Sequence, residues 1–206
     1  QEVYETYYLS ISFAAFTITL VLFPSFMSLY TSGIHDIQYV DKWLPYLFTA
    51  LYVLMYARRT SSQIINFAGH FQQTQWRSVI ESVINLSISI LLVSKIGIYG
   101  VLIGTIAALL YRTNDIIIYA NKKILNRSPL RTYRRWGVNL AVLVLLVTVF
   151  NHFLTGIDSY LMWAVNAVWV TIACLFAFLT VDSLFDRKSF VLVKRYITSF
   201  LSSRRR

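Results

Sequence analysis

The chain has 206 residues, of which 57% are hydrophobic and only 14% charged, and its formal net charge is +10. Soluble domains carry about 25% charged residues, so this composition excludes a soluble globular protein and indicates an integral membrane protein. A spanning helix needs about 20 mostly apolar residues, which leaves room for six such helices and no separate soluble domain. Because Glu2 and Glu5 precede the first apolar run, no signal peptide is predicted, and we expect a fragment that lacks its N-terminal portion.

Six apolar runs follow one another along the chain, and each predicts a transmembrane helix. The predicted fold class is therefore all-α. The second helix is the least regular, because its strictly apolar part spans about 22 Å, against a hydrocarbon core of about 30 Å. We expect it to continue through Arg58 and Arg59 to near Ala68, with Gly69 as its C-terminal cap. In order, the runs cover approximately residues 8–30, 43–68, 79–93, 98–119, 136–154 and 160–181.

Basic residues are concentrated in alternate connections. Of the 19 Lys and Arg, 16 lie in the connections after the second and fourth helices and in the tail, whereas Lys42 and Lys95 lie on the opposite side. The positive-inside rule therefore places both ends of the chain in the cytoplasm, and this distribution accounts for the net charge without nucleic acid as a partner. In the tail, 182–206, the hydrophobic positions follow helical spacing, which favours an amphipathic helix on the anionic leaflet over disorder. These positions are Phe190, Val193, Ile197 and Phe200.

Arginines fall at membrane depth in two predicted helices. An ionised Arg at the centre of a spanning helix costs about 2.5–3.5 kcal/mol, so we expect at least one of Arg58 and Arg59 to line a water-filled cavity. The alternative is that both are cytoplasmic anchors. Arg112 lies three residues before Asp115, a spacing that also permits a local ion pair.

The third predicted helix keeps one polar face for more than three turns. Arg77 and Glu81 have the spacing of a surface ion pair, but Asn85 and Ser89 lie deeper and indicate a helix contact or a lumen. Small residues spaced by four let membrane helices approach closely, so the glycines that open the next helix are predicted to be packing residues. They are Gly97, Gly100 and Gly104. The three histidines have no metal-ligand spacing, and no metal or cofactor is predicted.

Two sets of residues within 8–123 form a recognisable pattern. The first set is Pro24, Leu29, Tyr30, Thr31, Gly33, Asp36 and Tyr39. The second set is Gly69, His70, Phe71, Thr74, Glu81, Asn85, Ser89, Gly97, Tyr99, Gly100, Gly104 and Thr105. With these residues the segment resembles the C-terminal part of the polysaccharide flippases, the O-antigen and capsule repeat-unit translocases of the multidrug, oligosaccharidyl-lipid and polysaccharide exporter superfamily.

This resemblance implies a transporter of twelve to fourteen helices in two lobes, which flips undecaprenyl-pyrophosphate-linked oligosaccharide across the bacterial inner membrane. Residues 1–135 are then the last four helices of the second lobe, 136–181 an additional helix pair and 182–206 a basic cytoplasmic tail. The implied partners are the lipid-linked oligosaccharide, membrane lipids and the missing first lobe. Guanidinium groups bind phosphate oxygens at two points, so Arg58, Arg59 and Arg112 are expected to bind the substrate. Asn66 and Asn85 are further expected substrate-binding residues of the lumen.

Three other functions remain open at this stage. A multidrug or small-solute antiporter of the same fold would use membrane carboxylates for ion coupling, and Glu81 and Asp115 are the candidates under either function. A membrane polymerase or ligase is less favoured, because the longest external connection, 31–42, is short, and we expect no enzymatic activity. The last alternative is a structural membrane subunit without a lumen.

Overall fold

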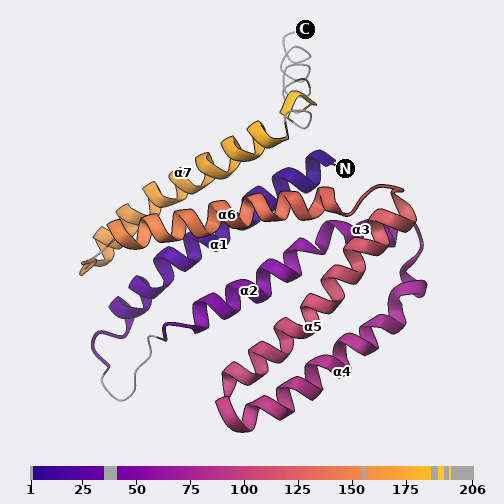
Figure 1. Cartoon of the computed structure of the whole chain (residues 1–206). Helices are drawn as coiled ribbons and strands as arrows, with labels where there is room; N and C mark the ends of the chain where they lie inside the picture. Colours follow the sequence, from indigo (N-terminus) through magenta and orange to yellow (C-terminus); the bar gives the residue numbers. More distant parts are fainter. Residues whose placement is uncertain (1, 35–40, 155, 187–189, 193–194, 196–206) are drawn as a thin grey trace. The chain divides into compact units, whose positions relative to one another are not determined.

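The computed structural model describes residues 2–34, 41–154, 156–186, 190–192 and 195, and all regular secondary structure in that part of the chain is helical (Figure 1). The predicted all-α class is therefore confirmed. The principal elements are α1 (Glu2–Tyr30), α2 (Leu44–Ala57), α3 (Arg59–Phe67), α4 (Phe71–Ile96), α5 (Ile98–Tyr119), a π-helical turn η1 (Ala120–Ile124), α6 (Leu130–Phe153) and α7 (Tyr160–Phe185).

Five of the described helices are long and apolar enough to cross a membrane. Their length and composition support the prediction of a helical membrane protein. The second predicted span, 43–68, is divided into α2 and α3, neither of which has that length, so the count of six is not confirmed. The five candidate spans are Val3–Tyr30, Phe71–Ile96, Ile98–Ile124, Leu130–Phe153 and Tyr160–Phe185.

The chain divides into two compact units. Unit 1 comprises Gln1–Val21 and Arg135–Arg206, and unit 2 comprises Leu22–Arg134. The predicted boundary after residue 135 lies next to the start of the second segment of unit 1. The first part of α1, however, belongs with that segment and not with the helices of unit 2.

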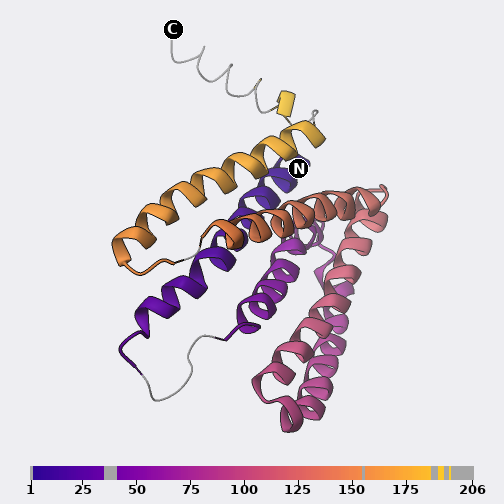
Figure 2. The same ribbon diagram turned by 60° about the vertical axis from the view of Figure 1, so that its left-hand side comes forward.

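In unit 2, α4 and α5 form a tight antiparallel hairpin (Figure 2). Gly97 lies between the two helices at φ +56°, a conformation that L side chains rarely adopt. Gly100 and Gly104 then let the two backbones approach. A Cβ added to Gly100 would lie 2.5 Å from the Leu92 carbonyl carbon, and one added to Gly104 would lie 2.8 Å from the Ser89 nitrogen. The close approach is thus made by Gly100 and Gly104, whereas Gly97 makes the turn.

A single residue, Arg58, interrupts the expected continuous helix between α2 and α3. The Leu54 carbonyl accepts a 3.1 Å hydrogen bond from the buried Thr113 hydroxyl of α5, and its bond from the Arg58 amide is stretched to 3.4 Å. A side chain that enters the backbone ladder is a recognised cause of a helix break. The break could not be predicted from residues 43–68 alone, because the Thr113 hydroxyl comes from another helix.

The expected cap at Gly69 is present. Gly69 has φ +72°, its amide donates to the Asn66 carbonyl and the His70 amide donates to the Ile65 carbonyl, both at 3.0 Å. These two bonds form a Schellman motif. They end α3 near the predicted position and lead directly into α4.

Asp41 fixes the start of α2. Its Oδ1 accepts from the Trp43 amide at 2.7 Å and the Leu44 amide at 2.9 Å, and its Oδ2 accepts from the Tyr99 hydroxyl. These hydrogen bonds, first that of Tyr99, hold the pKa of the Asp41 carboxyl below its usual range. The connection before α2 is thereby tied to the start of α5.

Unit 1 packs the first part of α1 with α6 and α7. The rings of Phe13 in α1 and Phe178 in α7 lie 6.5 Å apart, and Phe150 in α6 meets Trp169 in α7 edge to face at 5.2 Å. Cys174 is fully buried in this packing. In the predicted amphipathic tail, 190–192 are helical, whereas Val193, Ile197 and Phe200 lie outside the described residues.

Candidate functional site

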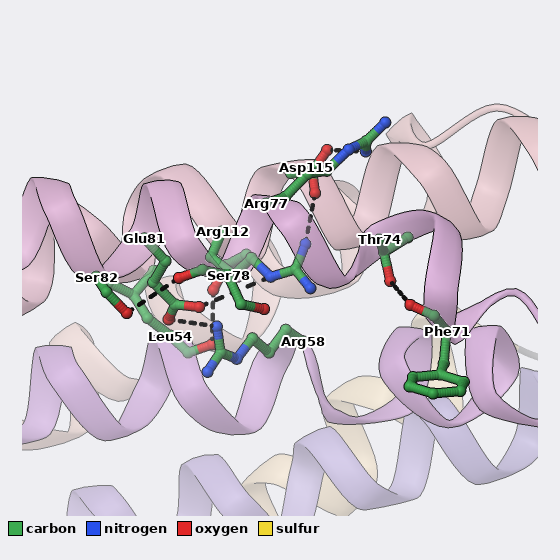
Figure 3. Close-up of polar contacts among 11 residues, drawn as sticks. Leu54, Arg58, Phe71, Thr74, Arg77, Ser78, Glu81, Ser82, Arg112 and Asp115 are labelled. Carbon is green, nitrogen blue, oxygen red and sulfur yellow. Dashed lines mark hydrogen bonds and ion pairs between the residues drawn. The ribbon is translucent and has the colours of Figure 1, made fainter.

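Five charged side chains from three segments of unit 2 meet in what we call the arginine cluster. It consists of Arg58, between α2 and α3, Arg77 and Glu81 of α4, and Arg112 and Asp115 of α5. Figure 3 shows these side chains directed toward one another across the three segments. The break at Arg58 and the tight hairpin of α4 and α5 position them.

Glu81 is shared by two arginines. Its Oε1 accepts a hydrogen bond from Arg58 Nη1 at 2.8 Å, and its Oε2 lies 3.7 Å from Arg112 Nε. One carboxylate therefore links the break after α2 to α4 and α5. Glu81 does not form the surface ion pair that its spacing from Arg77 permits, because it turns to the arginines of the neighbouring segments.

Asp115 is also shared. It accepts from Arg112 Nη1 at 2.8 Å, as the spacing of three predicted, and from Arg77 Nη1. The Arg77 guanidinium also lies over the rings of Trp76, at 5.7 Å, and Tyr119, at 5.2 Å, and such cation–π contacts favour a guanidinium. Arg77 is thus held at the cluster from three sides.

Three guanidinium groups face two carboxylates, so the arginine cluster has one positive charge in excess. The Arg112 side chain is only 8% exposed, whereas the other four are between 18% and 24% exposed. Charges at membrane depth are tolerated where they are paired or reach a cavity. Here they are paired, and the excess positive charge makes the cluster attractive to an anion.

A cavity of about 170 Å³ adjoins the cluster at Arg112. Most of its lining side chains are polar, which suits a group that forms hydrogen bonds and not a hydrocarbon chain. They are Ser62, Asn66, Thr74, Gln75, Ser78 and Arg112, together with Ile65, Phe71 and Ile116.

The structure brings together some of the predicted site residues and separates others. Arg58 and Arg112 meet in the cluster with both candidate coupling acids, and Asn66 is an exposed residue that lines the cavity. Arg59 is exposed and forms no ion pair within the described part of the chain. Asn85 lies in the packing of α4 against α5, where its Oδ1 accepts from Ser89 at 3.0 Å.

A second polar cluster, in unit 1, was not predicted. Arg135 of α6 contacts Glu5 of α1 at 3.0 Å and Asp186 beyond α7 at 2.5 Å, and Asp182 of α7 lies one turn deeper. The sequence reading placed Glu5 before the first helix and Asp182 in the tail. The sequence does contain a pattern that indicates a buried helix face here, because Thr6, Ser10, Phe13 and Thr17 follow helical spacing. The structure buries all four residues.

No protein-family model, curated protein or solved structure matches this chain.

Proposed function

We propose that the chain is part of a flippase that moves undecaprenyl-pyrophosphate-linked oligosaccharide repeat units across the bacterial inner membrane. The observation that carries the proposal is the arginine cluster, with its excess positive charge, beside a polar cavity at Arg112. The sequence resemblance to polysaccharide flippases supports the same function. The cluster would act on the anionic headgroup of the lipid.

The chemistry of the cluster suits a pyrophosphate. Guanidinium groups bind phosphate oxygens through two parallel hydrogen bonds, and Arg58 and Arg112 each direct a donor to Glu81. In this proposal Glu81 and Asp115 are counter-ions that hold the arginines in place until phosphate oxygens replace the carboxylate oxygens. The excess positive charge favours that replacement, because a pyrophosphate carries more negative charge than one carboxylate.

The cavity size indicates which part of the substrate the cluster holds. Sites for drug-sized ligands occupy about 300–1,000 Å³, and this cavity is about 170 Å³. It therefore suits the phosphates or a single sugar and not a whole repeat unit. In this proposal the oligosaccharide extends toward the other lobe that the resemblance implies.

Replacement of both Arg58 and Arg112 by alanine should abolish export of the polysaccharide, because the cluster would lose two of its three cations. The measurement is complementation of a bacterium that lacks its own flippase, with the full-length protein, together with binding of an isoprenyl pyrophosphate to the purified protein. The matched control is Lys123→Ala, which removes an exposed cation outside the cluster.

Normal export by the Arg58→Ala, Arg112→Ala double variant at wild-type membrane abundance would refute the proposal. If the double variant loses both export and membrane abundance, the binding measurement decides. It is made on purified variant protein that circular dichroism shows to be helical. Extrusion of cationic dyes by the wild type, without pyrophosphate binding, would instead favour the antiporter.

A further inference from the structure

Asp182 of α7 is a buried carboxyl group within a candidate membrane span. The residue is 3% exposed, and it contacts Ser10 of α1 and Asn139 of α6, which are 1% exposed each. The two carboxyl oxygens each lie 3.2 Å from Asn139 Nδ2, and Oδ2 also contacts the Ser10 hydroxyl. All of these residues belong to unit 1, whereas the arginine cluster belongs to unit 2.

No basic side chain directly contacts the Asp182 carboxyl group within the described part of unit 1, although the charge of Arg135 acts on it from a distance. The nearby charged groups are Glu5 on α1, Arg135 on α6 and Asp186 beyond α7. Arg135 directs Nη1 to Glu5 and Nη2 to Asp186, so the direct contacts of Asp182 are with neutral groups only. An ionised carboxylate in such a place is very costly, and a group of this kind becomes neutral instead.

The hydrogen-bond arrangement around Ser10 agrees with a neutral acid. Ser10 Oγ lies 2.9 Å from the Thr6 carbonyl oxygen and also contacts Asp182 Oδ2. A hydroxyl has one proton to donate, and a carbonyl oxygen only accepts. Both contacts become full hydrogen bonds if Asp182 carries a proton on Oδ2 and donates it to Ser10, while Ser10 donates to Thr6.

We propose that Asp182 is a proton-binding site of this protein, formed by α1, α6 and α7. Its proton comes from water and forms an O–H bond at Oδ2, and release returns the carboxylate and the proton to water. A membrane acid that gains and releases a proton is what coupling to a proton gradient requires. The inference does not depend on which substrate the arginine cluster binds.

Asp182 differs in this respect from the two acids expected to couple an ion. Glu81 and Asp115 each contact two arginines. Asp182 has neutral donors only. The proton site is therefore assigned to unit 1.

Infrared difference spectroscopy of the full chain in lipid vesicles at neutral pH tests the proposal. The wild type should show the C=O stretch of a protonated carboxylic acid, and this band should shift in heavy water and disappear as the pH is raised. Asp182→Asn should lack the band, whereas Asp158→Asn, which changes an exposed acid in a connection, should retain it.

Absence of the band from the wild type, its persistence in Asp182→Asn, or its failure to respond to heavy water or pH would each overturn the proposal. If Asp182→Asn does not fold, Ser10→Ala provides the test. The acid would then lose its hydrogen-bond acceptor, so the band should remain and move to higher frequency. An unchanged band in Ser10→Ala would also count against the assignment.

Discussion

Glu81 shows how one side chain determines the state of the arginine cluster. It accepts from Arg58 and approaches Arg112, so removing it leaves two guanidinium groups near one another with less compensating charge. Removing one partner of a paired charge costs more than the pair itself contributes, because the remaining charge stays desolvated. The same carboxylate also competes with any anion for the two arginines.

Glu81→Ala should therefore lower the free energy of unfolding by about 1–3 kcal/mol, toward the low end because the side chain is 21% exposed. Added inorganic pyrophosphate should raise the unfolding temperature of this variant more than that of the wild type, since the competing carboxylate is gone. Thermal unfolding of the protein in detergent measures both effects.

Glu81→Gln is the matched control, because it keeps the hydrogen-bond acceptor and removes only the charge. It should be less destabilised than Glu81→Ala and should respond to pyrophosphate. Equal or smaller stabilisation of Glu81→Ala by pyrophosphate, relative to the wild type, would contradict the view that Glu81 is a replaceable counter-ion.

At the scale of the helices, the hairpin of α4 and α5 depends on backbone contact. The side chains of α4 bury little surface against the rest of the unit. Many of its apolar residues are exposed, among them Val79, Val83, Leu86 and Ile90. In a membrane such a surface faces lipid or another helix, so α4 is held to the rest of unit 2 by its contact with α5 and by the arginine cluster. Gly100 and Gly104 are the positions at which this contact is closest.

Gly104→Ala should separate α4 from α5, because the new Cβ would lie 2.8 Å from the Ser89 nitrogen and 3.1 Å from the Asn85 carbonyl oxygen, both backbone atoms. Overpacking of this kind costs about 1–3 kcal/mol. Gly137→Ala is the control, since a Cβ at Gly137 has no atom within 4 Å. Equal unfolding temperatures of the two variants would show that the contact is not tight.

Sequence reasoning predicted helices where apolar length decided the outcome, and α5 begins and ends where it was expected. It placed the starts of α4 and α6 too late, at 79 and 136 instead of 71 and 130. The missing turns carry polar residues such as Gln73 and Arg131, which a hydropathy pattern assigns to a connection. The residues of these turns remain helical because Arg, Gln and similar side chains have good helix propensity.

The sequence predicted most of the charged residues that belong to the candidate site, but it did not predict which of them pair across segments of the chain. Spacing along one helix correctly gave Arg112 with Asp115 but also suggested Arg77 with Glu81, and the structure pairs those two with residues of other segments. Which neighbour a side chain chooses depends on how helices pack. The acids at positions 5 and 182 were missed for the same reason, because their contacts with Arg135, Ser10 and Asn139 depend on how three helices pack.

At the scale of the whole molecule, the distribution of Lys and Arg predicts the orientation of the chain in the membrane. The connection after α5 contains Lys122 and Lys123, whereas the connection between α6 and α7 has neither Lys nor Arg. Because α6 is a candidate membrane span, these connections should lie on opposite sides. The former is expected in the cytoplasm.

An engineered cysteine at Asp158 should react in intact cells with a maleimide that does not cross membranes, and a cysteine at Lys122 should react only after permeabilisation. Both positions are exposed. The natural Cys174 gives little background, since it is completely buried. The reverse labelling pattern would invert the proposed topology and place the arginine cluster nearer the outer leaflet.

The break at Arg58 has a mechanical consequence. A continuous helix resists bending because each turn is held by short backbone hydrogen bonds, but the bond from the Arg58 amide to Leu54 is already 3.4 Å long and its acceptor is shared with Thr113. Bending at this point stretches a weak bond instead of breaking a strong one. We therefore expect any bending of this segment to occur between α2 and α3, next to the Arg58 guanidinium group.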